Sequence, residues 1–171
     1  AGGGAVTLTT GGILVSSTVG ENISSISVGT LLAAPSTVSG NPDLNIIQNN
    51  TAAPLVISSA IPNSFVTTGA AATVSLVKAG AGHVIFTGSN TFTGNVRVYE
   101  GSIQFGSAVS SSIEFLIGSG ASSAKVVLGR DGTNFTSSVD YVTTVGSGTD
   151  NRIVAGSTGM SRLTLTGSVS V

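Results

Sequence analysis

Short runs of β-branched and aliphatic residues recur along the chain, separated by polar or glycine-rich stretches. Apolar and polar residues alternate within many runs, as in a half-buried strand, and no eleven-residue window carries a helical apolar stripe without glycine inside it. We therefore predict an all-β chain with essentially no helix. The predicted strands are 5–9, 13–16, 23–28, 44–48, 55–58, 74–78, 84–87, 96–99, 103–105, 113–117, 125–128, 139–145, 152–154 and 163–166.

Many of these strands start about eleven to thirteen residues after the previous one, and turn sequences such as Gly40-Asn41-Pro42-Asp43 lie between them. A short period of strand plus turn is typical of a meandering sandwich or of a solenoid with two or three strands per coil. The period alone leaves both architectures open.

The composition favours the solenoid. Charged residues make up 8% of the 171 residues, against roughly a quarter in an average soluble domain. Solvent faces must then be covered by Ser, Thr and Asn, which can stack in ladders at the ~4.8 Å strand spacing, where like charges would repel. We predict one β-solenoid segment over residues 1–171, excised from a longer chain.

The clearest repeat unit spans residues 76–106, and its alternation indicates which side chains face the core. We expect Gly80, Gly82, Gly94 and Gly101 at corners, where a tight bend needs positive φ or no Cβ. Asn90 suits a left-handed corner and an amide ladder. The predicted inward residues are Val84, Phe86, Val96, Val98, Ile103 and Phe105.

This unit resembles the autotransporter-associated β-strand repeat, also called the passenger-associated transport repeat, of bacterial autotransporters and large surface proteins. Two positions depart from the family pattern. His83 stands where the family usually has Thr, and Asn95-Val96-Arg97 stands where it favours small residues and Thr. The resemblance implies a right-handed parallel β-helix in a secreted or cell-surface bacterial protein. The matching residues are Lys78, Gly80, Gly82, Gly88, Asn90, Thr91, Phe92, Gly94, Gly101 and Gly106.

The charge distribution, the length of the apolar runs and the absence of Cys exclude several kinds of partner and of chemistry. The net charge is −1, and the six Lys and Arg residues are scattered singly, so we expect no nucleic acid partner and no binding to anionic lipid. No apolar run approaches the ~18–20 residues of a transmembrane helix. The absence of Cys removes disulfides and thiolate chemistry.

Candidate catalytic groups are few. His83 is the only His and has no Asp nearby in the sequence, so a Ser-His-Asp relay is not expected. The acid pairs Glu100 with Glu114 and Asp131 with Asp140 could meet across coils as in a glycosidase, but seven scattered acids are more typical of turns and solvated faces. We predict no enzyme activity, no catalytic or metal-binding residues and no cofactor.

We expect a structural or adhesive extracellular segment, such as a stalk, filament or surface layer. Its ends carry no charged or helical cap, so unpaired backbone groups there predict self-association through the β-helix ends. The alternative is a carbohydrate-active β-helix enzyme or a glycan-binding passenger domain. Surface glycans or host proteins would then bind at the loops 33–42 or 107–112.

Overall fold

The computed structural model describes residues 6–34, 40–65, 71–107, 109, 113–129, 134–144, 147–156 and 162–169. In this part of the chain, the only helical element is a short 3₁₀ turn, η1 (Ser17–Val19). No helix there has the length and apolar composition to cross a membrane. Each predicted strand overlaps an observed one, so the all-β prediction is confirmed.

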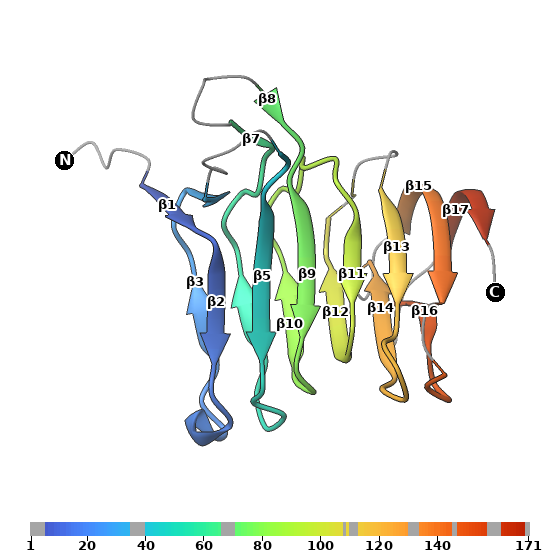
Figure 1. Cartoon of the computed structure of the whole chain (residues 1–171), viewed down its shortest axis with the longest axis horizontal. Coiled ribbons are helices and arrows are strands. Elements are labelled where there is room, and N and C mark those ends of the chain that lie inside the picture. The colour runs from blue at the N-terminus through green and yellow to red at the C-terminus, as the bar shows by residue number, and fades with distance from the viewer. Residues whose placement is uncertain are drawn as a thin grey trace.

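Thirteen strands form two parallel sheets (Figure 1). The chain passes from one sheet to the other and back, so each sheet gains one strand per passage. In spatial order, the seven-strand sheet contains β17 (Arg162–Val169), β15 (Asn134–Thr144), β13 (Glu114–Ile117), β11 (Val96–Val98), β9 (Ser75–Ala79), β5 (Asp43–Gln48) and β2 (Gly12–Val15). The six-strand sheet contains β16 (Arg152–Ala155), β14 (Ala124–Leu128), β12 (Gly101–Phe105), β10 (His83–Phe86), β6 (Leu55–Ile57) and β3 (Ser24–Ile26).

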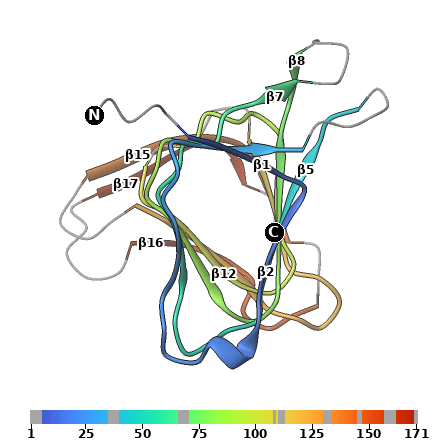
Figure 2. The same ribbon diagram turned by 90° about the vertical axis from the view of Figure 1, so that its left-hand side faces the viewer.

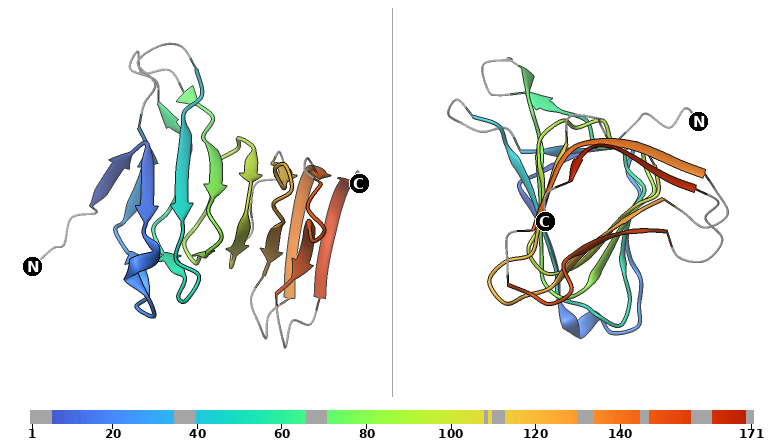
Figure 3. Two further views of the ribbon diagram at one scale, coloured as in Figure 1. Left: turned by 60° about the horizontal axis from the view of Figure 1, so that its bottom comes forward. Right: turned by 90° about the vertical axis from the view of Figure 1, so that its right-hand side faces the viewer.

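We call one strand of the seven-strand sheet together with the next strand of the six-strand sheet a layer. Viewed along the long axis, the strands of successive layers lie one behind another (Figures 2 and 3). Most strand residues of the inner layers therefore have register partners in the layers before and after them. Leu44, Leu76, Val96 and Phe115 are such partners, although they are unevenly spaced in the sequence.

The core lies between the two sheets and consists of aligned apolar columns. Leu55, Val84, Ile103 and Val126 form one column of the six-strand sheet, and all four are buried. The alternation of each strand puts every second side chain into this core. All six residues predicted to face inward are fully buried: Val84, Phe86, Val96, Val98, Ile103 and Phe105.

Three short strands were not predicted. β4 (Thr30–Ala33) pairs in parallel with β1 (Thr7–Thr10), and single bridges continue this row from Thr30 to Ala60 and from Ile61 to Asn90. β7 (Ser64–Phe65) and β8 (Ala71–Ala72) form an antiparallel hairpin beside the sheets (Figure 1). Two-residue strands carry no detectable alternation, and Leu and Ala in β4 have weak β-propensity.

Candidate functional site

Lys78 lies inside the core. β9 alternates regularly, and Lys78 shares the inward face with Leu76 two residues before it. Its register partners, Ile46 in β5 and Val98 in β11, are apolar. The Lys78 side chain is fully buried, which is rare for a lysine unless its charge has partners.

The partners of Lys78 are backbone carbonyl groups. Its Nζ donates to the carbonyl oxygen of Gly80, in the turn between β9 and β10. It also donates to the carbonyl oxygen of Glu100, 2.8 Å away in the equivalent turn of the next layer. One ammonium group therefore joins two successive layers at the corner where the chain leaves the seven-strand sheet.

Burial lowers the pKa of Lys78 from its ordinary value of 10.5 to about 8, and the negative charge of Glu100 partly opposes this shift. Lys78 is therefore mainly protonated at neutral pH. Because its ammonium is enclosed and already bonded to carbonyl groups, its chemistry is that of a structural clamp within the corner.

The glycines of this corner fulfil two different requirements. Gly80 and Gly101 have φ values of +80° and +71°, as predicted for corner positions. A Cβ on Gly101 would lie 2.6 Å from the carbonyl oxygens of Gly80 and Gly82. Gly82 has no positive φ; its Cβ would collide with the backbone of the preceding layer, and its N–H donates to the Gln48 carbonyl at 2.8 Å. Gly88 and Gly94 also lie too close to the preceding layer for a Cβ.

Gln48 extends this polar corner into the preceding layer and was not identified from the sequence. It is fully buried at the end of β5, and its Nε2 donates to the carbonyl oxygens of Ala53 at 3.2 Å and His83 at 3.5 Å. Its Oε1 accepts from the N–H of Asn50 at 3.3 Å. The available signal was its position: Gln48 continues the alternation of Leu44 and Ile46.

The prediction for Asn90 was wrong in its conformation. No described residue other than glycine has positive φ, so Asn90 is not in a left-handed conformation. Its register partner is Ile61, so no asparagine ladder forms. Instead, Asn90 Nδ2 donates to the carbonyl group of Gly88 at 3.0 Å, within the same turn, and to Ser107 Oγ at 3.3 Å. Its buried Oδ1 has no hydrogen-bond partner among the described residues.

The last motif positions complete the repeat. The N–H groups of Thr91 and Phe92 both donate to the Ile61 carbonyl. Phe92 is fully buried, with its ring centroid 6.5 Å from that of Phe105. Gly106 donates its N–H to the Phe86 carbonyl at 2.8 Å. The bonds to Ile61 attach the repeat to the preceding layer, and the bond between Gly106 and Phe86 connects the two layers of the repeat itself.

Glu100 and Glu114 are not brought together. Glu114 begins β13, and its Oε2 accepts from Asn95 Nδ2 at 2.9 Å. Glu100 follows β11 at the opposite end of the strands. Asp131 lies outside the described residues, and no side-chain contact is described for Asp140. In the ranges that the structure describes, no three acidic or His side chains form a metal-binding group.

His83 lies on the outer face of the six-strand sheet. Its Nδ1 is 2.6 Å from Ser102 Oγ, its register partner in β12. Partial burial lowers the pKa of His83; a hydrogen bond with Gln104 opposes this effect, and the charge of Lys125 adds to it.

Parts of the two loops considered for recognition, 33–42 and 107–112, lie outside the described residues.

Comparison with known proteins gives one family match. A family model described as the passenger-associated-transport-repeat matches residues 76–105. No curated protein and no solved structure matches the chain. The repeat is associated with bacterial autotransporter surface proteins and therefore indicates a secreted or cell-surface location. The matched segment, which is similar to the passenger-associated-transport-repeat, contains the Lys78 clamp and the glycines that pack against neighbouring layers.

Proposed function

We propose that this chain is a non-enzymatic, load-bearing segment of a bacterial surface protein. Its two sheets are the faces of a right-handed parallel β-helix, and the Lys78 corner is the joint that keeps successive layers in register. The observation that carries the proposal is the unbroken parallel pairing of both sheets, from β2 and β3 to β16 and β17. Such pairing resists bending and suits a stalk or filament.

The terminal strands support growth by stacking. Among the described strands, β2 and β3 each have one sheet neighbour. The N–H groups of Asn45 and Asn49 in and after β5 donate to the carbonyls of Gly11 and Val15. Because bonding groups alternate along a parallel strand, the N–H and C=O of Leu14 face the open edge. A second copy presenting its last layer can pair with this edge, which produces a filament.

The open edge can be tested at Leu14, whose side chain is exposed. Leu14→Pro removes one edge N–H while leaving the ladder to β5 intact, and proline is tolerated in edge strands. Leu14→Ala is the matched control, since it shortens the side chain and keeps the N–H. Light scattering and electron microscopy of the full chain over a concentration range would follow assembly.

We expect concentration-dependent filaments for the wild type and Leu14→Ala, and short or single particles for Leu14→Pro. Strictly monomeric wild-type protein at high concentration would contradict the stacking. Equal assembly by all three proteins would show that this strand edge is not the contact. Assays on polysaccharides would test the carbohydrate-active enzyme alternative, and turnover of any of them would contradict the non-enzymatic role.

A further inference from the structure

The outer face of the six-strand sheet carries a row of polar and basic side chains. His83, Ser102, Lys125 and Arg152 are consecutive register partners in β10, β12, β14 and β16. Consecutive partners in a parallel sheet are about 4.8 Å apart, and they point to the same side. The row therefore spans four strands of the sheet.

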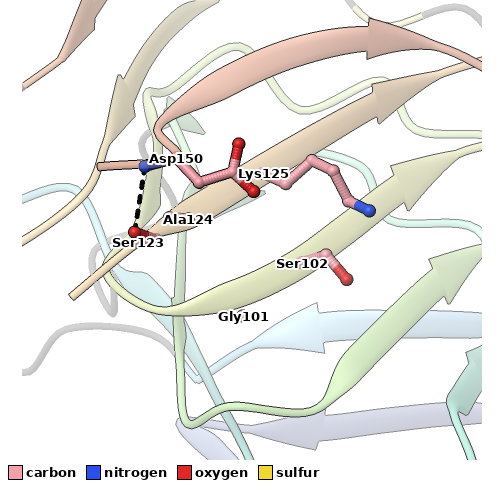
Figure 4. A pocket seen from close by; sticks show the side chains of 6 residues that line it. All are labelled: Gly101, Ser102, Ser123, Ala124, Lys125 and Asp150. Atoms are coloured by element: carbon pink, nitrogen blue, oxygen red, sulfur yellow. Dashed lines mark hydrogen bonds between the residues drawn. The ribbon is translucent and has the colours of Figure 1, made fainter. Parts of the chain in front are cut away.

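Two surface hollows lie on this row and share two of its members. One has a volume of about 240 Å³ and is lined by His83, Ser102, Gln104, Lys125 and Val127. The other has a volume of about 200 Å³ and is lined by Gly101, Ser102, Ser123, Ala124, Lys125 and Asp150 (Figure 4). Because both are lined by Ser102 and Lys125, the two hollows adjoin, and together they are called the depression here.

Lys125 supplies positive charge at the middle of the depression. In the described part of the chain, the ion pairs are Arg97 with Asp43 and Arg152 with Asp150. Asp150 Oδ1 lies 3.1 Å from Arg152 Nε, and Figure 4 shows the Lys125 amino group extending away from the Asp150 carboxylate. The charge of Lys125 is therefore available to an anion from solution.

The remaining lining selects the kind of ligand. Ser102 and Gln104 offer a hydroxyl and an amide, and the Asp150 carboxylate can accept from hydroxyl groups. Val127 is the one large apolar side chain of the two hollows. A surface depression lined mainly by polar groups suits a chain of hydroxyl-rich units and offers little to an apolar molecule.

We propose that this depression, here called the Lys125 site (His83, Ser102, Gln104, Lys125 and Asp150), binds an acidic oligosaccharide. The ligand lies across the strands, with a carboxylate or sulfate on the Lys125 ammonium and sugar hydroxyls on Ser102, Gln104 and Asp150. Binding at this face leaves the strand edges free. The site can therefore bind its ligand whether or not the chain stacks into filaments. A negative binding experiment would contradict this proposal and leave the stacking proposal unaffected.

The test is calorimetric titration of the full chain with defined tetrasaccharides. An oligogalacturonate presents carboxylates, a heparin-derived tetrasaccharide adds sulfates, and cellotetraose is the neutral control. Lys125→Gln removes the central charge, and Ser102→Ala removes the hydroxyl common to both hollows. Arg97→Gln is the matched control, because it removes one positive charge from the other sheet. Thermal unfolding checks that each variant is folded.

We expect at least one acidic tetrasaccharide to bind, and the stronger of the two identifies carboxylate or sulfate as the preferred anion. Lys125→Gln weakens that binding by about tenfold or more, as expected for loss of a charge-assisted hydrogen bond. Ser102→Ala weakens it less, and Arg97→Gln leaves it unchanged. Added salt weakens binding to the wild type.

Three outcomes would overturn the proposal. The first is no binding of either acidic tetrasaccharide. The second is equal binding of cellotetraose, which would make the charge irrelevant. The third is an equal loss in Lys125→Gln and Arg97→Gln, which would show a non-specific effect of net charge.

Discussion

The rings of Phe86 and Phe105 stack on each other across two neighbouring layers. Their centroids are 5.2 Å apart, and their planes are 14° from parallel. The two residues are register partners in β10 and β12, so the parallel pairing of the strands also brings the rings together. Phe115 packs against Phe105 from the other sheet, and their ring centroids are 6.1 Å apart. The aromatic side chains thus connect the two sheets and three successive layers.

Phe86→Ala tests this stack. Phe86 is fully buried, and its truncation removes apolar burial and leaves a cavity, so the free energy of unfolding should fall by about 3–5 kcal/mol. Denaturant unfolding measures it. Tyr99→Ala is the control, because the Tyr99 side chain is partly exposed and its loss should cost much less. A near-neutral Phe86→Ala would mean that the core does not depend on this ring.

A second prediction concerns the pH dependence of stability that Lys78 produces. Its pKa is lowered from 10.5 to about 8 in the folded chain. Between these two pH values the unfolded chain holds a proton that the folded chain has lost, so stability rises with pH over this range. The expected gain is on the order of 3 kcal/mol. Below pH 8 both states are protonated, and Lys78 causes no slope.

Lys78→Met separates this effect from other groups that titrate at high pH. Methionine keeps a long apolar side chain but has no proton to release. Denaturant unfolding at pH 7, 8, 9 and 10 should show stability increasing more steeply for the wild type than for Lys78→Met. Parallel pH profiles for the two proteins would show that the Lys78 ammonium is not desolvated by folding.

The sequence was sufficient to predict the strands of the two parallel sheets and the six inward residues of the repeat, because strand alternation needs only neighbouring residues. It was not sufficient for the Lys78 corner. Lysine is normally found outside a core. Only the position of Lys78, two residues after the buried Leu76 in the same strand, indicates that its side chain points inward. Its carbonyl partner at Glu100 depends on the register between layers, which a single repeat does not reveal. The same register decides that Asn90 faces Ile61.

A third prediction compares two glycines with positive φ. Gly101→Ala places a Cβ 2.6 Å from two backbone oxygens of the preceding layer. Gly120 also has positive φ, +53°, but a Cβ there meets nothing within 4 Å. Gly120→Ala should therefore cost about 1–2 kcal/mol from backbone strain alone, and Gly101→Ala about 1–3 kcal/mol more from overpacking. Thermal or denaturant unfolding would measure both; similar costs would show that the layers can separate to admit a methyl group.

The last prediction concerns Asn63, which joins three segments of the chain. Its Oδ1 accepts from the N–H groups of Val74 and Thr93 at 3.1 and 2.9 Å, and its Nδ2 donates to Thr93 Oγ1 at 2.9 Å. Asn63 precedes β7, while Val74 follows β8, so this one amide closes the base of the hairpin and attaches it to the next layer.

Asn63→Ala leaves two backbone N–H groups without their acceptor and should lower the free energy of unfolding by about 2–4 kcal/mol. Asn63→Asp is the informative partner, because its carboxylate can accept from both N–H groups, and the Thr93 hydroxyl can reverse and donate to it. We therefore expect Asn63→Asp to retain most of the stability that Asn63→Ala loses. Protonation at low pH does not abolish this, because a carboxylic acid keeps its carbonyl acceptor and its O–H can donate to Thr93 Oγ1 as the amide does. Equal losses for both variants at neutral pH would show that the acceptor function of Asn63 is not what holds the hairpin.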